Sequence, residues 1–125
     1  MRVKAVGIIP ARWNSTRFPG KALHVIAGKP LLRHVWERSE QAKTLEKVII
    51  ATDDMRIAEA AFGWGAEVSV TSAKHRSGTD RVAEVASKAP AFTHVLNIQG
   101  DEPLTDPELL DQLVREYRVT RSSRW

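Results

Sequence analysis

The sequence contains no cysteine and no long hydrophobic run, and both absences narrow what the protein can do. Without cysteine, disulfide bonds, thiolate zinc sites and cysteine nucleophiles are excluded. No apolar stretch approaches the roughly 20 residues that a membrane-spanning helix needs. Pro10 and Arg12 interrupt the apolar run near the start, so we expect neither a signal peptide nor contact with a membrane. These features favour a cytoplasmic protein.

Acidic residues are missing between Lys4 and Glu37, a segment that is rich in cations: Arg12, Arg17, Lys21, Lys29 and Arg33. The net charge is +4, but the segment 115–125 alone contributes +3 through four arginines and one glutamate, which leaves +1 for residues 1–114. A cationic block in a nearly neutral body favours a compact anionic ligand over a long polyanion. A nucleic-acid binder acting through the basic tail is the third-ranked alternative, because the charge lies in a tail without a recognisable pattern. We therefore expect no nucleic-acid partner.

Hydrophobicity alternates between short β-branched runs and helical spacing along the 125 residues, which is the length of one domain. The pattern predicts strands over 3–9, 47–52, 67–70 and 94–98. It predicts helices over 30–42, from a cap at Asp53 or Asp54 to about 63, over 79–88, and from Asp106 onward. This order predicts an α/β fold of three layers (α/β/α) around a mainly parallel sheet.

Apolar residues at helical spacing predict the buried faces of the helices. One face is expected to contain Ile57, Ala58, Ala61 and Phe62. A second is expected to contain Leu109, Leu110, Leu113, Val114 and Tyr117. Trp36 and Trp64 are expected to pack in the core.

Loops with unusual composition follow the predicted strands, at 10–21, 53–54, 71–79 and 99–105. The carboxyl ends of parallel strands meet at one edge of the sheet, where ligands of such folds bind. We therefore expect these loops to surround one site.

The loop 10–21 reads P-A-R-W-N-S-T-R-F-P-G-K and matches neither a Walker A loop nor a dinucleotide fingerprint. It combines three cations (Arg12, Arg17 and Lys21) with small residues that let backbone N–H groups approach a ligand. Arginine forks and a lysine point charge suit a di- or triphosphate. The alternative is a solvated basic loop.

Two further motifs are ambiguous when each is taken alone. In Q-G-D-E-P (99–103), Asp101 can reach a hard cation such as Mg²⁺, or can simply cap the turn; Glu102 is expected to be a solvated or capping group. In H-R-S-G-T-D-R (75–81), hydroxyls and a helix N-terminus can bind a base or ribose, or Ser77 or Thr79 can simply cap the helix. His75 is expected to have a loop role.

Together, four motifs in this order resemble those of 3-deoxy-manno-octulosonate cytidylyltransferase (CMP-Kdo synthetase): P-A-R-x-x-S-T-R-x-P-G-K, A-T-D-D (51–54), H-x-S-G-T-D-R and Q-G-D-E-P. The resemblance implies a nucleotide-diphosphosugar-transferase-like fold. It also implies transfer of CMP from CTP to 3-deoxy-manno-octulosonate (Kdo), with release of pyrophosphate and with Mg²⁺, for lipopolysaccharide biosynthesis.

The resemblance also implies roles for individual residues. Arg12, Arg17 and Lys21 would hold the triphosphate, and Asp101 would bind Mg²⁺, so that Arg12, Lys21 and Asp101 form the catalytic set. The cytidine would be framed by Ala11, Ser77, Gly78, Thr79 and Gln99.

Members of that family are much longer than this chain, so we expect residues 1–118 to be the N-terminal, nucleotide-binding half of such an enzyme, apparently truncated, and 119–125 to be an unpatterned basic tail. The competing hypothesis is a non-catalytic CTP-binding or assembly module that needs a partner chain. The strand at 94–98 would present an open sheet edge, which predicts a homo-oligomer or other self-association.

Overall fold

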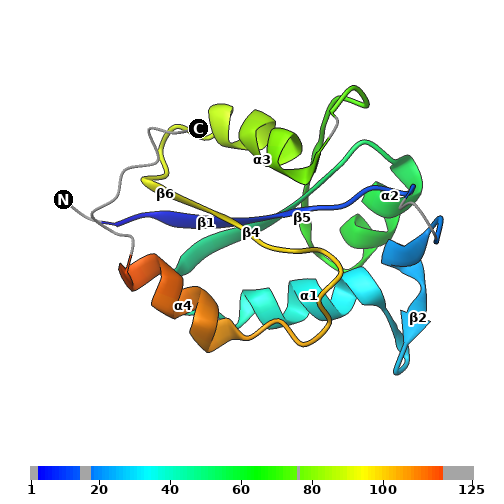
Figure 1. The fold of residues 1–125 in the computed structure, drawn as a ribbon, viewed down its shortest axis with the longest axis horizontal. Helices are drawn as coiled ribbons and strands as arrows, with labels where there is room; N and C mark the ends of the chain where they lie inside the picture. The colour runs from blue at the N-terminus through cyan, green and yellow to red at the C-terminus, as the bar shows by residue number, and fades with distance from the viewer. Residues whose placement is uncertain (1–2, 15–17, 76, 117–125) are drawn as a thin grey trace.

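A parallel four-stranded sheet organises the chain, which we describe from a computed structural model over residues 3–14, 18–75 and 77–116 (Figure 1). Its strands are β1 (Ala5–Pro10), β4 (Leu45–Thr52), β5 (Glu67–Val70) and β6 (His94–Asn97). The strand order is β5-β4-β1-β6, so β1 is central, while β5 and β6 are the edges of the described sheet. The predicted strands are therefore present, with ends shifted by at most two residues.

Helices cover both faces of this sheet, which confirms the predicted three-layer α/β fold (Figure 1). α1 (Leu31–Glu40), α2 (Met55–Gly63) and α4 (Pro107–Glu116) cover one face, and α3 (Gly78–Ser87) covers the other. The residues of β1 alternate between the two cores because successive strand side chains point to opposite faces. Ile9 packs with α1 and α2, whereas Val6 and Ile8 pack with α3. No described helix has the length and hydrophobicity to cross a membrane.

For two helices the sequence offered two candidate capping residues each, and the structure shows which one caps the helix. The Asp54 carboxylate accepts hydrogen bonds from the backbone N–H groups of Arg56 (2.9 Å) and Ile57 (3.3 Å), so Asp54 and not Asp53 caps α2. The Ser77 hydroxyl accepts from the N–H of Asp80 at 3.2 Å and caps α3. Asp53 and Thr79 are thus left without a capping role at these positions.

Short elements that were not predicted lie between β1 and α1. They are the 3₁₀ turn η1 (Lys21–Leu23) and the hairpin of β2 (Val25–Ile26) and β3 (Lys29–Pro30). Two-residue strands have no periodicity to detect, and both residues of β2 are exposed.

The predicted helix faces were wrong at two positions. Phe62 is 77% exposed and Leu109 is 51% exposed, because the neighbouring Ala61 and Leu110 occupy the core-facing positions. The polar Asp111 is buried instead, and its carboxylate accepts hydrogen bonds from the backbone N–H groups of Lys43 and Thr44. Trp36 and Trp64 lie at the core margin, with ring centroids 6.3 Å apart. Tyr117 lies outside the described residues.

Candidate functional site

A cleft of about 230 Å³ opens at the carboxyl edge of the sheet, between the ends of β1 and β6, η1 and the start of α3. Six of the nine residues proposed from the sequence line it: Ala11, Arg12, Lys21, Gly78, Gln99 and Asp101. Ser77 and Thr79 flank Gly78 at the start of α3 and are exposed. Arg17 lies outside the described residues. The loops after β1 and β6 therefore converge as the parallel topology predicts.

Lys21 and Asp101 face each other across this cleft although they are far apart in the sequence. The Lys21 Nζ lies 3.8 Å from an Asp101 carboxylate oxygen. The side chains are 43% and 62% exposed, so both are accessible to a ligand. At this exposure the ion pair itself contributes little to stability. The arrangement therefore provides a cation and a carboxylate at one end of an open cleft.

Backbone contacts fix the loop that follows β1. The Ala11 N–H donates to the Ala51 carbonyl (2.8 Å), which extends the β1–β4 pairing by one residue into the cleft. The Gly20 N–H donates to the Trp13 carbonyl (2.7 Å), which holds these two residues together. Gly20 has a φ of 75°, a left-handed conformation that glycine adopts without strain. Arg12 and Lys21 are the sequence neighbours of these two residues, Arg12 before Trp13 and Lys21 after Gly20.

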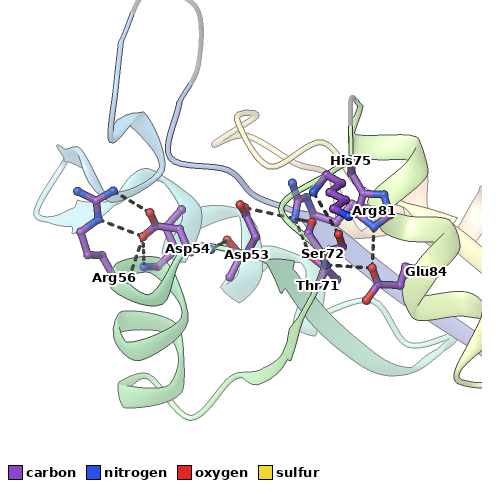
Figure 2. A network of polar contacts seen from close by, with 11 residues as sticks. Asp53, Asp54, Arg56, Thr71, Ser72, His75, Arg81 and Glu84 are labelled. Carbon is purple, nitrogen blue, oxygen red and sulfur yellow. Dashed lines mark hydrogen bonds and ion pairs between the residues drawn. The ribbon is translucent and has the colours of Figure 1, made fainter.

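Arg81 is a cleft residue that the sequence analysis did not single out. Its side chain is almost fully buried, and its guanidinium lies 3.3 Å from the Asp53 carboxylate. It also donates to the Thr71 hydroxyl and, at 3.4 Å, to the Ser72 carbonyl (Figure 2). Arg81 thus ties the first turns of α3 to the ends of β4 and β5. Both partners of this ion pair stand in motifs quoted above: Arg81 is the last residue of the 75–81 motif, and Asp53 is the first aspartate of A-T-D-D.

Glu84 makes a second attachment between α3 and the loop after β5 (Figure 2). Its carboxylate accepts hydrogen bonds from Lys88 Nζ (2.9 Å), the Ser72 N–H (3.0 Å) and His75 Nε2 (2.6 Å). These hydrogen bonds, of which the one from Lys88 has the largest effect, lower the pKa of Glu84 to about 2. His75 therefore has the loop role expected of it.

A second pocket adjoins the cleft and shares Arg12 and Arg81 with it. It is also lined by Trp13, Asp54 and Arg56. The Trp13 ring is covered by the Arg56 guanidinium, whose carbon lies 3.5 Å from the ring centroid. Trp13 thus contacts an arginine of α2, at the side of the cleft.

Asp101 is the one carboxylate lining the cleft, and the described residues contain no cluster of three or more histidines and acids that could enclose a metal. Glu102 instead shapes its own turn, since its side chain accepts from the Leu104 N–H (3.1 Å). Magnesium is commonly held by one or two carboxylates together with substrate phosphates. A single exposed aspartate beside cations therefore fits magnesium bound as a metal–phosphate complex.

The fold is a three-layer α/β domain with a cleft at the carboxyl edge of its parallel sheet, which is the edge at which folds of this class bind their ligands. The family model for cytidylyltransferases matches residues 6–125. The chain belongs to the cytidylyltransferase family.

Similar proteins carry one recurrent description. The chain is 52% identical over 122 residues to a 3-deoxy-manno-octulosonate cytidylyltransferase of Geobacter metallireducens, covering 98% of this chain and 48% of the relative. It is 50% identical over 120 residues to the mitochondrial enzyme of that name from Arabidopsis thaliana, covering 95% and 41%. The chain therefore spans about half the length of the curated relatives it matches.

Solved structures show the same fold. A CMP:2-keto-3-deoxy-manno-octonic acid synthetase in complex with CTP superposes with a TM-score of 0.88 at 43% identity, covering 94% of this chain and 48% of that one. A 4-diphosphocytidyl-2C-methyl-D-erythritol synthase superposes with a TM-score of 0.74 at 16% identity, covering 94% and 56%, a likeness of fold alone.

Proposed function

We propose that this chain binds CTP in the cleft and provides the nucleotide-binding half of an enzyme that transfers CMP to Kdo and releases pyrophosphate. The observation that carries the proposal is the meeting of Arg12, Lys21 and Asp101 around one cleft. The relatives of that name and the CTP complex of a similar synthetase support this choice of nucleotide and acceptor. The proposal includes a cytoplasmic location, where the nucleotide pool supplies CTP, and a place in lipopolysaccharide biosynthesis.

The cleft residues divide into two groups under this proposal. Arg12 and Lys21, joined by Arg17 from the same loop, hold the triphosphate, because guanidinium forks and an ammonium neutralise phosphate oxygens. The cytidine is framed by residues after the ends of β1 and β6 and at the start of α3: Ala11, Gln99, Ser77, Gly78 and Thr79. We propose residues 1–118 as this nucleotide-binding unit; the basic tail expected over 119–125 lies outside the described residues.

Asp101 would hold Mg²⁺ together with phosphate oxygens of the nucleotide. When bound, the metal supplies positive charge that offsets charge developing on the phosphates. The Lys21 ammonium, 3.8 Å from the Asp101 carboxylate, is placed to share the same phosphate group.

The reaction is an in-line displacement at the α-phosphorus. The anomeric hydroxyl of Kdo forms the new oxygen–phosphorus bond and loses its proton, while the bond to the β-phosphate oxygen breaks and pyrophosphate leaves. Such transfers depend on positioning and charge stabilisation more than on covalent chemistry by the protein. Arg12 and Lys21 accordingly act by orienting the triphosphate and neutralising the leaving pyrophosphate.

The second candidate is a non-catalytic CTP-binding or assembly module that acts with a partner chain. Both candidates predict CTP binding. They differ in pyrophosphate release from CTP, Kdo and Mg²⁺, which the module would show only after a chain supplying the remaining half is added.

CTP binding by the purified chain tests both candidates. With Mg²⁺ and CTP at about 100 times its dissociation constant, folding is stabilised by about 2.7 kcal/mol, which raises the thermal unfolding midpoint. Lys21→Ala should weaken CTP binding by at least tenfold, because it removes a charge-assisted contact to phosphate. Lys47→Ala, which removes an exposed lysine paired with Glu67 near the amino end of β4, is the matched control. An unchanged midpoint at millimolar CTP would overturn the proposal.

A further inference from the structure

Three side chains in contact, those of Trp13, Arg56 and Asp54, connect the segment that follows β1 to the start of α2. The Arg56 guanidinium lies over the Trp13 indole, with its carbon 3.5 Å from the ring centroid. Asp54 holds the same guanidinium in a forked ion pair, with Nη2 donating to one carboxylate oxygen (2.7 Å) and Nε to the other (3.2 Å) (Figure 2). Arg56 therefore makes a forked ion pair and a cation–π contact at once.

Asp54 restrains this group of side chains because it is also the residue that caps the N-terminus of α2. Its carboxylate accepts from two backbone N–H groups of the first helical turn in addition to the guanidinium. The pKa of Asp54 is lowered, mainly by the hydrogen bonds from the Arg56 side chain, so the carboxylate stays ionised at neutral pH. Asp54 thereby fixes the position of the guanidinium relative to the backbone of α2.

Gly20 lies against the same indole. A Cβ built on Gly20 would come within 2.9 Å of a Trp13 ring carbon, so the ring packs closely on the glycine backbone. The Gly20 N–H also donates to the Trp13 carbonyl at 2.7 Å. Trp13 is therefore held to Gly20 within the loop and to Arg56 outside it.

Arg12 and Lys21 are the immediate neighbours of these two held residues, and both line the cleft. A shift of the Trp13 ring would move Gly20 and change the spacing of the two cations. Arg56 is paired with Asp54, so the pair adds almost no net charge to the cleft. Removing Arg56 would leave the Asp54 carboxylate without this partner, so a Trp13 substitution, which changes no charge, tests geometry alone.

We propose that Trp13 and Arg56 are positioning residues, which fix the spacing of Arg12 and Lys21 and thereby set the affinity for the triphosphate of the nucleotide. The proposal rests on the CTP-binding function proposed above. Arg56 and Trp13 touch the loop and each other, and they act on the nucleotide only through the two cleft cations.

Dissociation constants of CTP and CMP, measured by calorimetry on the same variants with Mg²⁺, test this role. Arg56→Ala and Trp13→Leu should each weaken CTP binding about three- to tenfold, as expected for losing a cation–π contact and its anchoring. CMP lacks the β- and γ-phosphates, so its dissociation constant should change by less than twofold. The loss in the double variant should be smaller than the sum of the two single losses, because both substitutions break the same Arg56–Trp13 contact.

Conservative variants separate positioning from folding. Trp13→Tyr keeps an aromatic face and should retain CTP binding within about twofold, and Arg56→Lys, which keeps the charge but not the fork, should be intermediate. Lys47→Ala again serves as the control for removal of an exposed paired cation. Equal losses for CTP and CMP, or additive losses in the double variant, would overturn the positioning role. If the unaltered chain binds no CTP at all, the proposed function fails, which is a different outcome from normal CTP binding by the Arg56 and Trp13 variants.

Discussion

Gly100 is the residue at which the loop after β6 passes the end of β1. A Cβ at this position would lie 2.8 Å from the Pro10 carbonyl oxygen, a backbone atom, and 3.4 Å from an Ile9 side-chain carbon. A backbone atom of the central strand has little freedom to move. Glycine is thus required here by close approach, and Asp101 reaches the cleft because its neighbour has no side chain.

Gly100→Ala should therefore both destabilise the protein and damage the cleft. Overpacking a close-packed site costs about 1–3 kcal/mol, and the displaced turn would carry Asp101 away from Lys21, so CTP binding should weaken as well. Chemical denaturation and CTP titration measure the two effects. Gly63→Ala is the matched control: a Cβ there meets nothing within 4 Å, and alanine in α2 should leave stability equal or raise it by about 0.5–1 kcal/mol. Equal stabilities of the two variants would contradict the close-approach argument.

Single residues show what the sequence could and could not reveal about the cleft. Lys21 and Asp101 could be proposed because each lies in a loop after a strongly apolar strand, and the parallel topology brings such loops together. Arg81 could not, because a helical arginine is ordinarily a solvated surface residue. Its burial depends on Asp53 and Thr71, whose positions beside it follow from packing across β4 and β5.

Among the elements, α3 and the loop after β5 are joined through Glu84, and this attachment is sensitive to acid. The pKa of Glu84 is lowered to about 2 in the folded protein, against about 4.3 for an unperturbed glutamate. Because the folded-state pKa is the lower one, the stabilisation is fully present above about pH 5 and is lost as the pH falls toward 2.

Glu84→Gln tests this attachment. The free energy of unfolding of the variant should be lower than that of the unaltered protein at pH 7, and the difference should shrink steadily on acidification from pH 5. Urea denaturation at a series of pH values measures it. Glu59→Gln, at an exposed glutamate of α2, should show almost no difference across the range. A Glu84→Gln difference that stayed constant down to pH 3 would contradict the assigned contacts.

The longer elements could be predicted because their burial leaves a periodic signal. β1 and β4 are apolar runs between two helical layers, and α3 repeats apolar residues at helical spacing. The hairpin of β2 and β3 leaves no such signal. Phe62 and Leu109 misled the prediction because apolar residues that precede or follow a core position can belong to the exposed face of the helix.

For the whole molecule, β6 is a sheet edge over the described residues, and the predicted self-association would use it. The N–H groups of His94 and Ile98 donate toward β1, to the carbonyls of Lys4 and Ile8. By strand alternation, the N–H of Asn97 points to the open side, where another strand could accept it.

Asn97→Pro should therefore abolish edge pairing while leaving the β1–β6 ladder intact, because proline removes only the outward donor. If the chain associates through this edge, sedimentation velocity over a range of concentrations should show the unaltered chain shifting toward larger species and the variant remaining monomeric. Asn97→Ala keeps the donor and should behave like the unaltered chain. Association that persists in Asn97→Pro would place the contact elsewhere.

The central place of β1 also governs when the protein can fold during synthesis. One side of β1 is completed by β4 and the other only by β6, with Ala5 paired to His94. On the ribosome, β1 gains its second neighbour only after residues 94–97 have emerged, and such distant pairing slows folding. The cleft is then complete only after Asp101 has emerged, so a nascent chain interrupted before residue 101 would carry Arg12 and Lys21 without the acid that faces Lys21.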